Sequence, residues 1–239
     1  MISNFILDAL LAIVPVILAI TLHEAAHGYA ALALGDTTAR DQGRLTLNPL
    51  KHIDRMGTII LPGFLLITQL LTIHRVAFMF GWAKPVPVSA WKFASPRRGM
   101  AIVAIAGPGM NFFLAWLTAV AGHAVPGFAE VPRYLEGLTD MPALSPVIIV
   151  LLSFMVTNLV LGLFNLLPIL PLDGGRVVSG FLPETVARSW AKLERYGLLV
   201  VLICILVLPN LFGFNPIGEA LDAVLPRASW IIFWLAGSS

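Results

Sequence analysis

Charge is scarce in this sequence. Asp, Glu, Lys and Arg make up only 12% of its 239 residues, whereas 58% are hydrophobic, and the mean hydropathy is +0.89. Soluble domains carry about 25% charged residues, so this composition excludes a soluble globular protein and predicts a polytopic membrane protein. With its short loops, the chain has room for one membrane domain over residues 1–239 and for no sizeable soluble module.

Cysteine is almost absent as well. The single Cys204 lies in an apolar run, which excludes an internal disulfide framework. The net charge of +2 is too small to indicate a nucleic-acid partner. The N-terminus lacks the positive stretch of a cleaved signal peptide, and its apolar run continues into the next helix, so we expect it to be retained.

The apolar run of residues 2–34 carries His23, Glu24 and His27. On an α-helix, positions i and i+4 share one face, so both imidazoles can face a single cation. Glu24 lies about 100° round the helix from His23. This His-Glu-x-x-His pattern is typical of zinc hydrolases, in which the histidines bind zinc and the glutamate takes the proton of a water molecule. The alternative, two histidines satisfied by neighbouring groups, leaves Glu24 buried without a role.

Two histidines leave a catalytic zinc site short of one protein ligand. His74 and His123 lie at the ends of apolar segments and are poorly placed to supply it. Asp173 follows a long apolar segment at a matching depth, and the two glycines after it allow a sharp turn and close backbone approach. We favour Asp173 as the third ligand. The alternative is an Asp-Gly-Gly turn that ends a helix.

The hydropathy pattern predicts an all-α fold with about five to six transmembrane helices. The clear spanning segments are residues 2–34, 100–123, 147–170 and 196–212. Residues 56–73 either cross or re-enter, and residues 217–236 either lie in the interface or span. If residues 56–73 re-enter, thirteen of the fifteen Lys and Arg residues share one side, which is then the cytoplasmic side. We therefore expect a re-entrant segment in a multi-pass cell-membrane protein, with the active site towards the cytoplasm.

Three sequence motifs occur together: HEAAH at 23–27, GPGMN at 107–111 and NLLPILPLDGG at 165–175. This combination resembles the site-2 protease family of intramembrane zinc metallopeptidases, in a compact prokaryotic form without a PDZ insertion. The resemblance covers about residues 15–180, the expected catalytic core, and the C-terminal helices over 196–236 follow it.

The resemblance implies a role for individual residues. His23, His27 and Asp173 would hold one Zn²⁺ per chain, and Glu24 would activate the water. Asn165 would engage the substrate backbone near the scissile bond. Asn111, from the GPxxN pattern, is a further substrate-binding candidate.

Residues 80–89, FGWAKPVPVS, predict a short extended strand that dips into the membrane, because Pro85 and Pro87 exclude a helix. A substrate helix must unwind before its peptide bonds can be attacked, and its exposed amides then need partners. An edge strand supplies such partners by strand addition. Trp82, Lys84 and Val86 are therefore candidate substrate-binding residues.

These features predict an intramembrane zinc endopeptidase that cuts membrane-anchored proteins within or near their transmembrane helices. One alternative is a related zinc hydrolase that acts on another membrane-embedded amide. Another is a non-proteolytic zinc-binding protein or transporter. Transporters tend to repeat ionisable ligands along a path and to show internal repeats, whereas this sequence has one ligand set and no repeat.

Overall fold

The computed structural model describes residues 2–72, 74, 81–132 and 144–237. All regular elements within these residues are helical, which confirms the predicted all-α class. The α-helices are α1 (Ile2–Ala33), α2 (Thr38–Asp41), α3 (Leu61–Thr72), α4 (Pro96–Gly122), α6 (Pro146–Asn165), α7 (Asp173–Phe181), α8 (Glu184–Lys192), α9 (Glu194–Leu202), α10 (Leu208–Phe212) and α11 (Pro216–Ala236).

Within the described part of the chain, five helical stretches are long and apolar enough to cross a membrane. They are Ile13–Ala33, Arg55–Thr72, Pro96–Gly122, Pro146–Asn165 and Glu194–Phe212. Their number and length agree with a multi-pass membrane protein.

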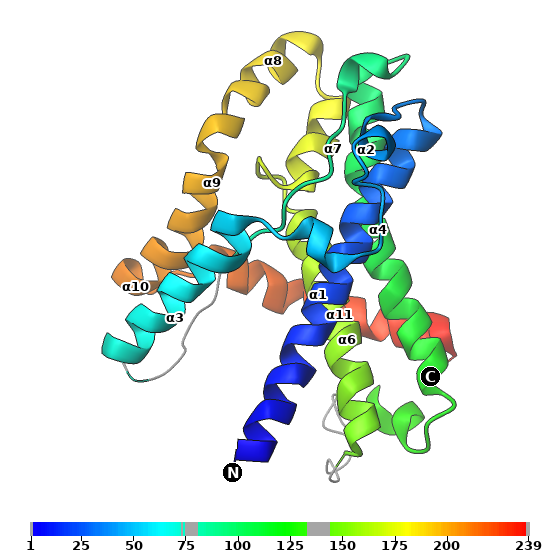
Figure 1. Cartoon of the computed structure of the whole chain (residues 1–239), viewed down its shortest axis with the longest axis vertical. Helices are drawn as coiled ribbons and strands as arrows, with labels where there is room; N and C mark the ends of the chain where they lie inside the picture. Colours follow the sequence, from blue (N-terminus) through cyan, green and yellow to red (C-terminus); the bar gives the residue numbers. More distant parts are fainter. Residues whose placement is uncertain (1, 73, 75–80, 133–143, 238–239) are drawn as a thin grey trace.

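Helices α1, α4 and α6 run along the long axis of the molecule and form its centre (Figure 1). Ala115 and Ala119 of α4 and Met155 and Leu159 of α6 are fully buried in one core. Small side chains such as alanine let helix backbones approach closely, which is how membrane helices pack. Helix α4 also contacts α7, so it connects the helix that carries the two histidines with the helix that begins at Asp173.

The C-terminal helices surround this bundle. Helices α9 and α10 lie at the same side of the view as α3, whereas α11 runs across the long axis (Figure 1). Ile232 and Phe233 of α11 are buried in the core formed with α4 and α6. From the sequence, residues 217–236 could either lie in the interface or span the membrane. In the structure they belong to one helix that packs on the bundle, and this helix is not among the five stretches apolar enough to span.

The two ends of the excursion through α3 lie side by side. The Trp82 N–H donates to the Gly57 carbonyl at 3.1 Å, and the Thr58 hydroxyl donates to the Trp82 carbonyl at 2.9 Å. A Cβ on Gly57 would lie 2.4 Å from the Trp82 ring, and a Cβ on Gly81 would lie 2.4 Å from the Gly57 carbonyl oxygen. Glycine is required at both positions for this close return of the chain.

Residues 81–89 correct one part of the sequence prediction. Their backbone is mostly irregular and extended, but the structure assigns no strand within the residues it describes. Pro85 and Pro87 lack the N–H groups that strand pairing needs. The predicted strand is therefore an extended segment only, and Phe80, its expected first residue, lies outside the described residues.

Candidate active site

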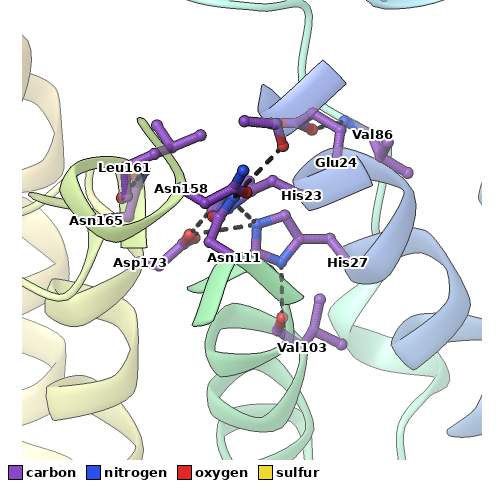
Figure 2. A network of polar contacts seen from close by, with 11 residues as sticks. His23, Glu24, His27, Val86, Val103, Asn111, Asn158, Leu161, Asn165 and Asp173 are labelled. Carbon is purple, nitrogen blue, oxygen red and sulfur yellow. Dashed lines mark hydrogen bonds and ion pairs between the residues drawn. The ribbon is translucent and has the colours of Figure 1, made fainter. Parts of the chain in front are cut away.

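His23, His27 and Asp173 come together in the centre of the bundle (Figure 2). The Nε2 atoms of the two histidines are 3.0 Å apart, and each lies 3.2 Å from Oδ2 of Asp173. All three residues are buried. The one-turn spacing on α1 thus presents both imidazoles to a carboxylate that is distant in the sequence.

The outer nitrogen of each ring contacts a hydrogen-bond acceptor. Nδ1 of His27 lies 2.7 Å from the Val103 carbonyl oxygen, and Nδ1 of His23 lies 2.6 Å from Oδ1 of Asn111. Each Nδ1 therefore carries the proton, and each Nε2 presents a lone pair. Asp173 Oδ2 is buried and has no assigned hydrogen-bond partner among the described residues. With both Nδ1 atoms protonated, it and the two Nε2 atoms present three lone pairs to one point, where a metal cation would satisfy all of them.

The spacing fits zinc. Zinc binds nitrogen and oxygen at about 2.0–2.1 Å, and tetrahedral angles then place the ligand atoms about 3.3 Å apart. The observed separations of 3.0, 3.2 and 3.2 Å are close to this value. Two neutral imidazoles and one carboxylate form a common catalytic donor set, which leaves a fourth position open.

Two glycines allow Asp173 to reach the histidines. A Cβ on Gly174 would lie 2.2 Å from the Leu166 carbonyl oxygen, and a Cβ on Gly175 would lie 2.7 Å from the Leu170 nitrogen. The first turn of α7 is therefore pressed against the chain that leaves α6. The indole N–H of Trp190 also donates to the Gly175 carbonyl at 2.9 Å, which fixes this turn from α8.

Gly107 of α4 lies directly against both imidazoles. A Cβ at this position would lie 2.4 Å from Nε2 of His27 and 2.6 Å from Cε1 of His23. Real Cβ atoms essentially never make contacts that short, so any other residue at position 107 would have to displace the two imidazoles. The sequence alone indicated no role for Gly107, the first glycine of the GPGMN motif.

Glu24 lies beside the extended segment. Its Oε2 accepts a hydrogen bond from the Val86 N–H at 2.9 Å (Figure 2). The neighbouring Lys84 N–H donates to the His52 carbonyl at 2.8 Å, and the Lys84 carbonyl accepts from Arg44 at 2.9 Å. Backbone groups of Trp82, Lys84 and Val86 are thus already engaged within the protein.

Asp36, just after α1, fixes the far end of the same segment. Its Oδ2 accepts from the Ser89 N–H at 2.6 Å, and the Lys92 ammonium lies 3.2 Å from its Oδ1. Burial raises the pKa of Asp36, but hydrogen bonds from Thr38, Ser89 and Lys92 outweigh it and lower the pKa to about 2. The carboxylate is therefore charged near neutral pH and ties the segment to the end of α1.

A cavity of about 600 Å³ opens onto the His–Asp cluster. Besides His23, Glu24, His27 and Asp173, the side chains that line it are mainly apolar and come from α4, α6, α9 and the extended segment. Such a lining suits a hydrophobic polypeptide.

The remaining predicted site residues lie in different surroundings. Trp82, Val86 and Asn165 line the cavity, whereas Lys84 and Asn111 are not among its lining residues. Asn111 is fully buried, and its amide faces His23. Three groups at the site were not predicted from the sequence: the Val103 carbonyl, Gly107 and a second buried asparagine, Asn158, which contacts Asn111. Asn158 could have been noticed in the sequence, because a polar residue within an apolar membrane segment often has a functional or structural role.

Comparison with protein families shows that residues 11–208 match the model of peptidase family M50. The chain is 38% identical over 194 residues to the "Putative zinc metalloprotease YwhC" of Bacillus subtilis, covering 80% of this chain and 78% of that protein.

Two further similar proteins are each named "Putative zinc metalloprotease Rip2". The Mycolicibacterium smegmatis protein is 31% identical over 82% of this chain and 66% of its own length. The protein of Mycobacterium tuberculosis H37Rv is 28% identical over 83% of this chain and 67% of its own length. No solved structure matches the chain.

Proposed function

This chain belongs to peptidase family M50 and is an intramembrane zinc metalloprotease, and from that premise we propose which of its residues perform the reaction. His23, His27 and Asp173 hold the zinc ion, and Glu24 is the general base. The observation that carries this assignment is the convergence of three buried lone pairs within 3.2 Å of one another. Within the described residues, these side chains form a single closed set, unlike the repeated ligands of a transport path.

Zinc at this site would lower the pKa of a water molecule towards ~7 and polarise the scissile carbonyl. Glu24 takes the proton of the attacking water and delivers it to the leaving nitrogen. The hydrogen bond from the Val86 N–H holds the Glu24 carboxylate at the cavity wall. Asn165 uses one N–H on the Leu161 carbonyl at 3.0 Å, and its remaining polar groups serve the substrate backbone or the developing oxyanion.

The substrate is a membrane-anchored protein whose helix unwinds beside the extended segment. Along an extended chain, backbone groups of successive residues point to opposite sides. Trp82, Lys84 and Val86 direct N–H groups towards the protein. On the opposite edge, Pro85 and Pro87 lack N–H groups, and the Pro85 carbonyl accepts from Arg44 at 3.3 Å. The substrate therefore pairs there mainly by donating its own amides to the carbonyl oxygens of Ala83 and Pro87. The Trp82 and Val86 side chains contact the substrate from the cavity wall.

The segment that contains α3 re-enters on the side from which it came. The contacts of Trp82 with Gly57 and Thr58 support this reading, because they bring the two ends of the excursion to one place. The excess of Lys and Arg on that side makes it the cytoplasmic side of the cell membrane.

This topology predicts the labelling of single cysteines in a Cys204→Ser background. A membrane-impermeant maleimide should label Gln42→Cys, Trp91→Cys and Arg188→Cys only after the cells are permeabilised, because all three exposed positions face the cytoplasm. Ala129→Cys, which is exposed at the other end of α4, should be labelled in intact cells. Labelling of position 91 but not of position 42 in intact cells would show that the α3 segment crosses the membrane.

The ligand assignment predicts about one zinc ion per purified chain. Asp173→Ala should weaken zinc binding by at least ~10²-fold, because a three-ligand site loses one of its ligands. Competition with a chromogenic chelator measures this change, and Asp222→Ala, at an exposed position of α11, is the matched control. Unchanged zinc affinity in Asp173→Ala would rule out the assigned site. Zinc-dependent cleavage of single-span membrane proteins by the wild type tests the protease activity.

A further inference from the structure

We propose that Asn158 of α6 is a positioning residue for the zinc ligand His23, and that it acts through Asn111 of α4. The inference rests on the proposed assignment of His23 as a ligand. Asn158 and Asn111 are both fully buried, and neither lines the cavity. Their side chains form a hydrogen-bonded connection from α6 through α4 to α1 (Figure 2).

The direction of each hydrogen bond in this connection follows from the backbone. The Phe154 carbonyl can only accept, so the group of Asn158 that lies 2.9 Å from it is the amide nitrogen. Asn158 must then turn its oxygen to Asn111, whose Nδ2 lies 2.9 Å away. Asn111 is left with its own oxygen facing Nδ1 of His23, at 2.6 Å.

The two histidines differ in how their orientation is secured. His27 donates to a backbone carbonyl, that of Val103, whose polarity is fixed. His23 donates to a side-chain amide, which can rotate by 180° and present an N–H instead. In that flipped state, Nδ1 of His23 would need to accept, and the proton would move to Nε2, where it blocks metal binding.

Asn158 opposes the flipped state. Rotation of the Asn111 amide would place its oxygen against Oδ1 of Asn158, now 2.9 Å from the nitrogen, in a site that water does not reach. Two acceptors in contact without a donor are unfavourable in a buried site. The other acceptor near Nδ2 of Asn111 is the Ala19 carbonyl at 3.4 Å, a longer and weaker contact. Asn158 therefore selects the amide orientation in which His23 offers its Nε2 lone pair.

The test is a double-mutant cycle on zinc affinity, measured by chelator competition on the purified full-length protein, which does not depend on catalysis. Leucine has a volume similar to that of asparagine and no polar group. Asn158→Leu should therefore weaken zinc binding about 3- to 10-fold. A group that contacts the metal ligand directly typically contributes more, about 10- to 100-fold. In an Asn111→Ala background, the same change should have less than about a two-fold effect, because the residue through which it acts is gone.

Leu159→Ala is the matched control, since Leu159 is equally buried and adjacent on α6 but has an apolar side chain. It should lower the Tm without changing the zinc affinity. If Asn158→Leu does not fold, Asn158→Ala carries the same expectation. The inference would be overturned if the Asn158 variant bound zinc as tightly as the wild type. It would also be overturned if the Asn158 substitution lowered zinc affinity equally in the wild-type and Asn111→Ala backgrounds. Asp173→Ala distinguishes failure of the proposed zinc site from failure of the positioning role of Asn158. Unchanged zinc affinity in Asp173→Ala contradicts the zinc site itself, whereas the Asn158 variants test only the positioning role.

Discussion

Glu24→Gln is expected to remove peptide hydrolysis while the protein keeps its zinc. Glu24 is next to His23 in the sequence, but the group proposed to bind the metal, found within the described residues, is His23, His27 and Asp173. Glutamine is almost the same size as glutamate and cannot accept the proton of the attacking water. Loss of a general base costs typically ~10² to 10⁴ in rate. In the proposed mechanism Glu24 also protonates the leaving nitrogen, so we expect a greater loss here.

The structure explains why this substitution leaves the fold intact. Among the described residues, the Glu24 carboxylate accepts one hydrogen bond, from the Val86 N–H. The amide oxygen of glutamine can accept the same bond, so the extended segment keeps its contact with α1. Substrate should therefore still bind in the cavity and remain uncut.

Two measurements on proteoliposomes check this expectation: zinc per chain, and cleavage of single-span helices that carry a Gly-Pro pair to ease unwinding. Glu184→Gln is the matched control, because Glu184 is exposed on α8 and its carboxylate pairs with Arg188 one turn later. Cleavage by Glu24→Gln within a few fold of the wild type would refute the mechanism. A transporter or a metal store would be little affected by the change.

Gly107→Ala is expected to destroy the zinc site by adding a single methyl group. The Cβ would overlap both imidazoles, at 2.4 Å from His27 and 2.6 Å from His23. Neither ring can simply swing aside, because Val103 and Asn111 hold their outer nitrogens. Either the rings leave the metal-binding geometry or α4 moves away from α1, and both outcomes separate the ligands. We expect zinc affinity to fall by at least ~10²-fold, as for loss of a ligand.

Gly109→Ala supplies a close control for this prediction. It lies two residues further along the same helix, and a Cβ there would meet no atom within 4 Å. Alanine favours a helix over glycine by about 1 kcal/mol, so this variant should be as stable as the wild type and bind zinc equally well. Chelator competition and thermal unfolding measure both effects. Equal zinc affinity of the two alanine variants would show that α4 does not press on the histidines.

The sequence by itself determined the class of the protein and the chemistry of its metal site. The shortage of charge indicated a membrane protein, and the one-turn spacing of His23 and His27 placed two imidazoles on one helix face. Asp173 was predicted as the third ligand because it alone among the acids follows a long apolar segment at a matching depth. These features are local in the chain, since hydropathy and helix periodicity depend only on neighbouring residues.

Only the tertiary structure decided what surrounds those residues. Three contacts join helices or segments that are far apart in the sequence. Gly107 lies against both imidazoles, Asn158 accepts a hydrogen bond from Asn111, and the Val86 N–H donates to Glu24. Residues 80–89 were predicted as an edge strand open to the substrate, whereas the described part, 81–89, is an extended segment whose inward N–H groups are bonded to the protein. Such contacts depend on how α1, α4 and α6 pack, and packing registers are set by the shapes of all the facing side chains together.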